Sequence, residues 1–152
     1  MKVAIGNDHG GVELKKHLVE YLEKNGHEVV NVGIDEVVST DYPIYAERVA
    51  KAVLSGDCDK GILICGTGIG ISISANKIHG VRCALCSEPV SAALARQHNN
   101  ANIVAMGART IGPVMAEEIV RTFLTTEFEG GRHARRVEKI MRLDRGESLL
   151  ES

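Results

Sequence analysis

The chemically most suggestive segment of the chain is Cys65-Gly66-Thr67-Gly68-Ile69-Gly70, in which a thiol directly precedes a glycine-rich turn. Three glycines at alternate positions remove side chains, so that backbone N–H groups can point at an anion or at a developing oxyanion. A helix that begins in this turn would favour the thiolate of Cys65 over the thiol. The pattern indicates a reactive sulfur beside an anion site. The alternative is a buried cysteine that acts as a small apolar side chain.

Two nucleotide-binding patterns are incomplete in this turn. The dinucleotide fingerprint G-x-G-x-x-G requires a glycine where Ile71 stands, although Glu88 lies about 20 residues downstream, as the ribose-binding acid should. The loop G-x-x-x-x-G-K-[ST] is absent from the sequence. The turn therefore does not indicate a nucleoside triphosphate enzyme.

A second polar turn, Gly6-Asn7-Asp8-His9-Gly10-Gly11, follows the first strand that we predict. It places a carboxylate and an imidazole at the carboxyl end of that strand, where α/β proteins bind ligands. We favour a functional role for Asp8 and His9. The alternative is that Asp8 caps the next helix and His9 is a solvated loop residue.

Cationic side chains in the second half of the chain are candidates for binding an anion. Arg132 and Arg136 are four residues apart and share one face if the helix includes position 132. Two converging guanidinium groups are suited to a phosphate, whereas the alternative is a solvated basic face. His98 ends a predicted helix, so it could also be a C-terminal cap. Arg109 follows the last predicted strand.

Short β-rich runs alternate with segments of helical period along the whole chain. In the first helix, Leu14, Leu18 and Leu22 recur every four residues, and charged residues that include Lys15 cover the remaining, solvent-facing positions. The predicted strands are 2–7, 27–33, 61–65, 81–86 and 102–106. The predicted helices are 12–25, 43–54, one that follows the glycines at 66–70, 89–99, one that starts near Gly112-Pro113, and 133–145.

Five strands separated by helices predict an α/β fold, a doubly wound (Rossmann-like) five-stranded parallel sheet with helices on both faces. No internal repeat or linker divides residues 1–152, so we expect a single domain. Ligands bind such sheets at the carboxyl ends of the strands, near a topological switch point. The turns that follow the strands are therefore the places where a site is expected.

The composition excludes several classes of partner. With 18 Lys and Arg against 20 Asp and Glu, three Tyr, two Phe and no Trp, the chain lacks the basic face and stacking rings typical of nucleic-acid binding. The longest charge-free stretch, 61–76, has 16 residues, fewer than the roughly 20 that a membrane helix needs. The first residues have no signal-peptide pattern. We expect a cytoplasmic protein with no membrane or nucleic-acid partner.

Four cysteines in a chain without an export signal are expected to be reduced. Cys83 and Cys86 have the C-x-x-C spacing of redox and metal sites. They lie in a predicted strand, however, where positions i and i+3 point to opposite faces. We therefore expect no metal site.

Taken together, these motifs resemble the type B ribose-5-phosphate isomerases, a family that also includes galactose-6-phosphate and allose-6-phosphate isomerases. The resemblance covers nearly the whole chain and keeps the order of the family's motifs. The motifs are Gly6-Asn7-Asp8-His9-Gly10-Gly11, Asp41-Tyr42-Pro43, Cys65-Gly66-Thr67-Gly68-Ile69-Gly70, Ser74-Ala75-Asn76-Lys77, Arg96-Gln97-His98-Asn99 and Arg132-His133-Ala134-Arg135-Arg136.

The resemblance implies isomerisation of ribose 5-phosphate to ribulose 5-phosphate through a cis-enediolate, without a cofactor. In the branch of the family that this sequence matches, the residue at Cys65 is the base that moves the proton between C1 and C2. Another branch uses a glutamate at the position of Ile71, which cannot take a proton. Thr67 and the backbone amides of residues 66–70 are expected to hold the enediolate oxygens.

The same resemblance assigns the remaining site residues. It implies that His98 helps to open the furanose ring, with Asp41 and Tyr42 nearby, and that Asp8 and Asn99 contact sugar hydroxyls. The phosphate group would be bound by His9, Arg109, Arg132 and Arg136. In the family the site is shared within a homodimer, and a tetramer is an alternative assembly. The C-terminal helix segment, 133–147, could contact the partner through Val137, Ile140 and Met141, or pack on its own subunit.

Two other functions remain open. A six-carbon sugar phosphate, allose or galactose 6-phosphate, could be isomerised by the same groups, because the sequence does not measure the length of the pocket. The galactose enzymes usually divide the site between two unlike chains, whereas this chain holds both Cys65 and His98, which favours the pentose. A non-catalytic module that binds sugar phosphates or nucleotides would bind ligand without turnover and would be indifferent to the loss of Cys65.

Overall fold

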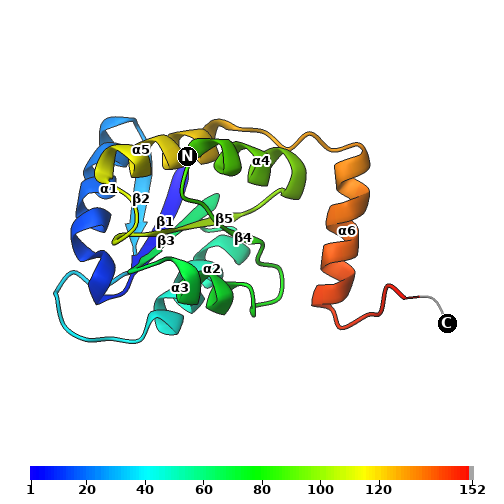
Figure 1. Ribbon diagram of the computed structural model, residues 1–152, viewed down its shortest axis with the longest axis horizontal. Helices are drawn as coiled ribbons and strands as arrows, with labels where there is room; N and C mark the ends of the chain where they lie inside the picture. The colour runs from blue at the N-terminus through cyan, green and yellow to red at the C-terminus, as the bar shows by residue number, and fades with distance from the viewer. Residues whose placement is uncertain (151–152) are drawn as a thin grey trace.

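A computed structural model describes residues 1–150 of the chain as one open sheet with helices on both faces (Figure 1). All strand pairs are parallel, and the strand order is β2-β1-β3-β5-β4. This arrangement confirms the predicted doubly wound α/β fold. The strands are β1 (Lys2–Asn7), β2 (Glu28–Asn31), β3 (Lys60–Cys65), β4 (Cys83–Leu85) and β5 (Ile103–Gly107).

Helices cover both faces of the sheet and bury two apolar layers against it (Figure 1). One face carries α1 (Val12–Lys24), α4 (Pro89–Asn99) and α5 (Pro113–Thr125), and the other carries α2 (Tyr42–Leu54) and α3 (Ile69–Ala75). A 3₁₀ turn, η1 (His9–Gly11), precedes α1, and α6 (Arg132–Asp144) stands at one end of the molecule. Within residues 1–150, no helix has the length and apolar character required to cross a bilayer.

The helices form where their sequence signals predict them. Leu18 and Leu22 of the α1 stripe are completely buried. Helix α4 begins after Glu88, whose carboxylate accepts a hydrogen bond from the backbone N–H of Ser91 at 3.0 Å and caps the first turn. Most helix ends lie within one residue of their predicted positions, because these caps and prolines are local signals. Helix α3 is an exception, since it begins at Ile69, inside the glycine cluster.

Two strands are shorter than predicted, and one side chain lies elsewhere than expected. Strand β2 ends at Asn31 rather than 33, because the Asn31 side chain accepts a hydrogen bond from the N–H of Gly33 at 3.0 Å and turns the chain. Strand β4 begins at Cys83 rather than 81, since the N–H of Arg82 donates to the Asn102 side chain at 2.8 Å. The prediction that Lys15 faces solvent is wrong, because this residue is only 1% exposed.

Strands β1 and β3 lie side by side at the point where the winding of the fold reverses. The chain passes from β1 through α1 on one face to β2, and from β2 through α2 on the other face to β3. We call the edge of the sheet where the strands end the carboxyl edge, and the edge where they begin the amino edge. The switch point is at the carboxyl edge, between the last residues of β1 and β3, and it fixes where Asp8 and Cys65 meet.

The core prediction concerns Phe123 of α5, which is completely buried in the layer beneath α1 and α4. Replacing Phe123 with Ala removes a large apolar side chain, and the free energy of unfolding should fall by about 3 to 5 kcal/mol. Urea unfolding followed by circular dichroism measures this change. Val114 on the same helix is 74% exposed, so Val114→Ala should change the free energy of unfolding by less than about 0.5 kcal/mol. Equal losses in both variants would contradict the assigned core.

Candidate active site

The two polar turns predicted from the sequence meet at the switch point. The backbone N–H of Asp8 donates to the carbonyl of Ile64 at 3.2 Å, directly before Cys65. The turns approach so closely that a Cβ added to Gly10 would lie 3.4 Å from the backbone nitrogen of Gly66. The first turn therefore lies against the second, and their side chains share one region of the carboxyl edge.

Cys65 accepts a hydrogen bond from the main chain of the glycine turn. Its side chain is 4% exposed, and its Sγ lies 3.1 Å from the backbone N–H of Gly68. A donor aimed at sulfur stabilises the negative charge of a thiolate. The turn reaches this position because Gly68 has φ +78°, and a Cβ there would lie 2.6 Å from Leu85 and 2.7 Å from Met106. Only glycine fits this position.

Some backbone N–H groups of the glycine turn donate to other atoms of the protein, and others have no partner in the described part of the chain. The Thr67 hydroxyl accepts a hydrogen bond from the N–H of Ile69 at 3.2 Å, while the N–H of Gly68 is bound to Cys65. Thr67 is itself exposed. Within residues 1–150, these bonds leave the amides of Gly66, Thr67 and Gly70 as the donors available to a ligand oxygen.

Asp8 and His9 are held in the first turn by specific hydrogen bonds. Asp8 is 6% exposed and accepts a hydrogen bond from the N–H of Gly10 at 2.9 Å, so it caps the 3₁₀ turn. The Nδ1 atom of His9 accepts a hydrogen bond from the N–H of Thr40 at 3.2 Å. A backbone N–H can only donate, so neutral His9 carries its proton on Nε2.

Tyr42 and Arg109 flank the glycine turn. A Cβ added to Gly70 would lie 2.5 Å from the Tyr42 ring, so the ring rests on the main chain at that glycine. The N–H of Arg109 donates to the carbonyl of Gly66 at 2.9 Å, and its side chain lies within about 4 Å of the same glycine's Cβ position. Asp41, at the start of α2 beside Tyr42, is exposed and makes no capping hydrogen bond.

Four predicted site residues lie away from this group. Helix α4 ends at the amino edge, since the N–H of Gly61 at the start of β3 donates to the carbonyl of Asn102. His98 and Asn99 are therefore separated from Cys65 by the length of β3, about 16 Å. Arg132 and Arg136 lie on α6, which begins beside α4 because the N–H of Glu129 donates to the carbonyl of Gln97. Figure 1 shows α6 and the 33–41 loop at opposite ends of the long axis.

His98 belongs to a cluster that the sequence did not reveal. Its ring stacks on His133 with centroids 4.2 Å apart and planes 8° from parallel. Both rings approach the same Glu129 oxygen through Nε2, at 3.8 Å for His98 and 3.6 Å for His133. Burial lowers the pKa of His133, as do His98 and Arg132, so the neutral imidazole is favoured. The spacing of these residues, in two helices and a loop, gives no sequence signal.

The stacking of the two rings in this cluster does not suit a metal ion bound by both of them. The ligand atoms of His98, Glu129 and His133 all lie within 4.8 Å of one another. An imidazole nitrogen binds a metal in the plane of its ring, and two stacked, nearly parallel rings cannot both contain one ion. The arrangement instead places two ring nitrogens at one carboxylate oxygen.

Cys83 and Cys86 lie on opposite faces of the sheet, as predicted. Cys86 belongs to the layer beneath α4 and α5, and Cys83 packs against the layer beneath α2 and α3. Burial raises the pKa of Cys83 to about 12 and that of Cys86 to about 11. Both thiols are therefore protonated near neutral pH, and the C-x-x-C spacing does not form a redox pair.

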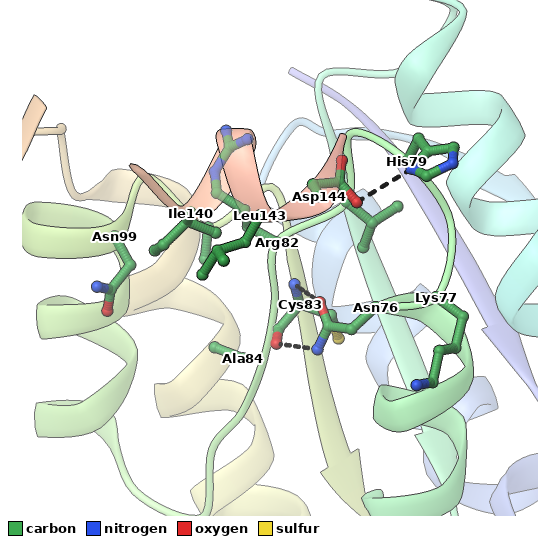
Figure 2. A pocket seen from close by; sticks show the side chains of 12 residues that line it. Asn76, Lys77, His79, Arg82, Cys83, Ala84, Asn99, Ile140, Leu143 and Asp144 are labelled. Carbon is green, nitrogen blue, oxygen red and sulfur yellow. Dashed lines mark hydrogen bonds and ion pairs between the residues drawn. The ribbon is translucent and has the colours of Figure 1, made fainter. Parts of the chain in front are cut away.

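A pocket of ≈ 580 Å³ lies between α6 and the start of β4 (Figure 2). Ile140 and Leu143 of α6 form one wall, and Asn99 lies at one side. Asn76 holds the opposite wall through two hydrogen bonds to the backbone of Cys83, at 2.9 and 2.8 Å. Of the predicted site residues, only Asn99 lines this pocket.

The fold and the site together define a class of protein: a doubly wound α/β protein with a thiol and a glycine-rich turn at its switch point. The family model described as Ribose/Galactose Isomerase matches residues 3–140. The chain therefore belongs to this family of sugar isomerases.

Relatives and solved structures agree with this family. The chain is 50% identical over 143 residues to ribose-5-phosphate isomerase B of Escherichia coli, which covers 94% of this chain and 96% of that protein. A structure of Clostridium thermocellum ribose-5-phosphate isomerase B is similar, with a TM-score of 0.95, 50% identity, and coverage of 96% of this chain and 99% of that one. The Mycoplasma genitalium isomerase B with bound ribulose-5-phosphate matches with a TM-score of 0.90, 43% identity, and coverage of 95% and 96%.

The hydrogen bond to Cys65 predicts a difference in thiol reactivity. Cys65 and Cys86 are equally buried, 4% and 3% exposed, so access to the solvent does not distinguish them. At pH 8 only about one Cys86 in a thousand is ionised, because its pKa is raised. Iodoacetamide should therefore alkylate Cys65 more than about tenfold faster than Cys86. Peptide mass mapping over time measures both rates.

Urea-unfolded protein is the control for this experiment, since all four cysteines should then react at similar rates. Equal rates for Cys65 and Cys86 in the folded protein would contradict a stabilised thiolate at Cys65.

Proposed function

We propose that this protein interconverts ribose 5-phosphate and ribulose 5-phosphate without a cofactor, with Cys65 as the base. The observation that carries the proposal is the Cys65 sulfur, held by the N–H of Gly68 at the switch point of an isomerase-family fold. The thiolate takes the proton from C2 of the open-chain aldose, and the C1 carbonyl becomes an enediolate oxygen. The proton returns to C1 while the O2 proton passes to O1, so no electrons leave the substrate.

The glycine turn supports this chemistry by stabilising the enediolate. An enolate forms slowly in water because its charge is unsupported, and an oriented donor lowers that barrier by about 3 to 4 kcal/mol. A positioned base contributes about 10²- to 10⁴-fold in rate. The amides of Gly66, Thr67 and Gly70 supply the donors in this proposal. Ile71 is completely buried and carries no ionisable group, which leaves Cys65 as the base.

The proposed site closes around the substrate only when two copies of the chain associate. Cys65, Asp8 and Tyr42 lie at the carboxyl edge, whereas His98 and the arginines of α6 lie beyond the amino edge. We infer that a second copy brings its His98, Asn99, Arg132 and Arg136 to the first copy's Cys65. His98 then opens the furanose ring, and Arg132 and Arg136 join His9 and Arg109 at the phosphate.

Exposed apolar side chains support a homodimer. Strand β4 is an edge strand, and large apolar residues on β4 and its neighbours α3 and α4 are exposed. An apolar surface of this kind is typical of an interface between subunits. On α6, Val137 is buried, whereas Ile140 is 40% exposed, so only part of this helix packs on its own chain. The exposed residues on α3, β4 and α4 are Ile69, Ile73, Leu85, Val90 and Leu94.

The substrate and the location of the protein are part of the proposal. The family description names both ribose and galactose isomerases, and we favour the pentose because one chain carries both Cys65 and His98. A six-carbon sugar phosphate is the alternative. The four free cysteines are consistent with the reducing cytoplasm. A binding module without activity would be indifferent to the loss of Cys65.

Replacing Cys65 with Ala should lower kcat by about 10²- to 10⁴-fold, since the base is removed. The KM for ribose 5-phosphate should change little, because the thiol does not bind the phosphate. Steady-state assays with ribose, allose and galactose phosphates measure both the variant and the substrate preference. Cys86→Ala removes an equally buried thiol from the opposite layer and should retain activity. A fully active Cys65→Ala variant would refute the assignment of the base.

Complementation between two inactive variants tests the shared site. Chains with Cys65→Ala and chains with His98→Ala should each be inactive as homodimers. After they are mixed in equal amounts and allowed to exchange subunits, each heterodimer has one intact site, so about a quarter of the wild-type activity should return. Mixing each variant with buffer is the control. No recovery, despite exchange confirmed by native mass spectrometry, would show that one chain supplies both groups.

A further inference from the structure

The connection between β2 and α2, residues 32–41, has no regular secondary structure but touches the candidate site at one end. It leads into Asp41 and Tyr42, and the N–H of Thr40 donates to His9 Nδ1. A ten-residue irregular segment has many conformations available to it. What holds this connection therefore decides whether Thr40 and His9 remain aligned.

The Lys15 side chain forms hydrogen bonds with the first part of this connection. The residue belongs to α1 and is 1% exposed, so its ammonium group needs partners inside the protein. It donates to the carbonyl of Ile34 at 2.8 Å, to the Asn31 side chain at 3.3 Å, and to the Asp35 carboxylate. The Asn31 amide also donates to Asp35 at 2.9 Å. Lys15 therefore ties residues 31–35 to a helix of the core.

Asn7 adds a second tie to the same carbonyl group. Its side-chain amide donates to the carbonyl of Ile34 at 3.0 Å and to that of Asp8 at 2.8 Å. The Ile34 carbonyl thus accepts from both Lys15 and Asn7. The connection is therefore linked to the turn that carries Asp8 and His9.

The last part of the connection determines which nitrogen of His9 can donate. Thr40 is fixed by its hydroxyl, which lies 2.9 Å from the Tyr45 hydroxyl, as well as by its N–H to His9 Nδ1 at 3.2 Å. Because Nδ1 accepts, the proton of neutral His9 is on Nε2. A neutral imidazole in this tautomer can donate to an anion without first gaining a proton.

We propose that Lys15 is a positioning residue for the phosphate half of the site: it anchors the 32–41 connection, whose Thr40 amide fixes His9 as an Nε2–H donor. The proposal rests on the proposed function, in which His9 binds the substrate's phosphate. Lys15 itself contacts no substrate. It acts through three successive links, from Lys15 to residues 31–35, along the connection to Thr40, and from Thr40 to His9.

The interaction of Lys15 with Asp35 is specific rather than a general attraction of surface charges. The Lys15 hydrogen bond, followed by that of Asn31, lowers the pKa of Asp35, so the carboxylate stays charged and the pair stays formed at neutral pH. The adjacent Lys16 is exposed, and its ammonium lies 3.9 Å from Glu13 on the same helix. Lys16 therefore carries the same charge on the same helix but makes no contact with the connection.

Replacing Lys15 with Met tests the proposal, because Met keeps the length of the buried stem and removes the ammonium group. We expect the KM for ribose 5-phosphate and the Kd for inorganic phosphate to rise about five- to tenfold, with kcat within about twofold of the wild type. Steady-state kinetics and calorimetric titration with inorganic phosphate measure these constants. Lys16→Met is the matched control and should leave both constants unchanged.

A spectroscopic signature separates positioning from a general loss of structure. In the ligand-free wild type, the ¹⁵N resonances of His9 should show an unprotonated Nδ1 and a protonated Nε2, and Lys15→Met should move them toward mixed tautomers. Comparison with a His9→Gln spectrum assigns these resonances. Unchanged phosphate affinity and unchanged His9 resonances in a folded Lys15→Met variant would overturn the proposal.

A second variant decides the question if Lys15→Met does not fold. The Asp35 side chain is 66% exposed, so Asp35→Ala removes one partner of Lys15 without disturbing the core. It should shift phosphate affinity and the His9 resonances in the same direction by a smaller factor, and wild-type values would overturn the proposal. Phosphate titration and the His9 resonances need no turnover. A wild-type protein that binds inorganic phosphate but isomerises no sugar phosphate would therefore refute the proposed function and leave the role of Lys15 standing.

Discussion

The hydrogen bond from the N–H of Gly68 to the sulfur of Cys65 is the interaction on which the proposed chemistry depends. It exists because the chain turns through a left-handed glycine whose Cβ would collide with Leu85 and the backbone of Met106. Residues of β4 and β5 therefore pack against the turn at Gly68, and the Gly68 N–H donates to the sulfur. Burial raises the pKa of Cys86, which has a similar exposed fraction and, within residues 1–150, no such donor. In the part of the chain that the structure describes, Cys65 and Cys86 thus differ in one backbone N–H donated to the sulfur rather than in exposure.

The remainder of the carboxyl edge is built to keep its two polar turns in register. Asn7 joins the carbonyls of Asp8 and Ile34, and Lys15 reaches the Ile34 carbonyl from α1. On the other side of the turn, the Tyr42 ring rests on Gly70 and Arg109 lies beside Gly66. The site region is thus fixed by side chains from β1 and α1 that donate to main-chain carbonyls of neighbouring loops.

The sequence predicted the features that depend on local signals and missed those that depend on tertiary contacts. The alternation of strands and helices, the glycine turn after Cys65 and the start of a helix at Pro89 are encoded within a few residues, and the structure confirms them. Lys15 was assigned to solvent because helical periodicity records the face of a residue but not the connection that folds over it. Likewise, Thr40 is 31 residues from His9, and Glu129 is 31 residues from His98. No local pattern connects such pairs.

The opposite placement of Cys65 and His98 has a consequence for how the protein responds to dilution. Each chain presents the two groups at different edges of its sheet, so any reaction that uses both depends on the fraction of chains that are paired. By mass action, that fraction falls as the total concentration approaches the dissociation constant of the pair. Catalytic capacity would then fall more steeply than protein amount, and it could be lost while every chain remains folded. In the proposed shared site, the affinity of the chains for each other would thus set the lowest concentration at which the protein can work.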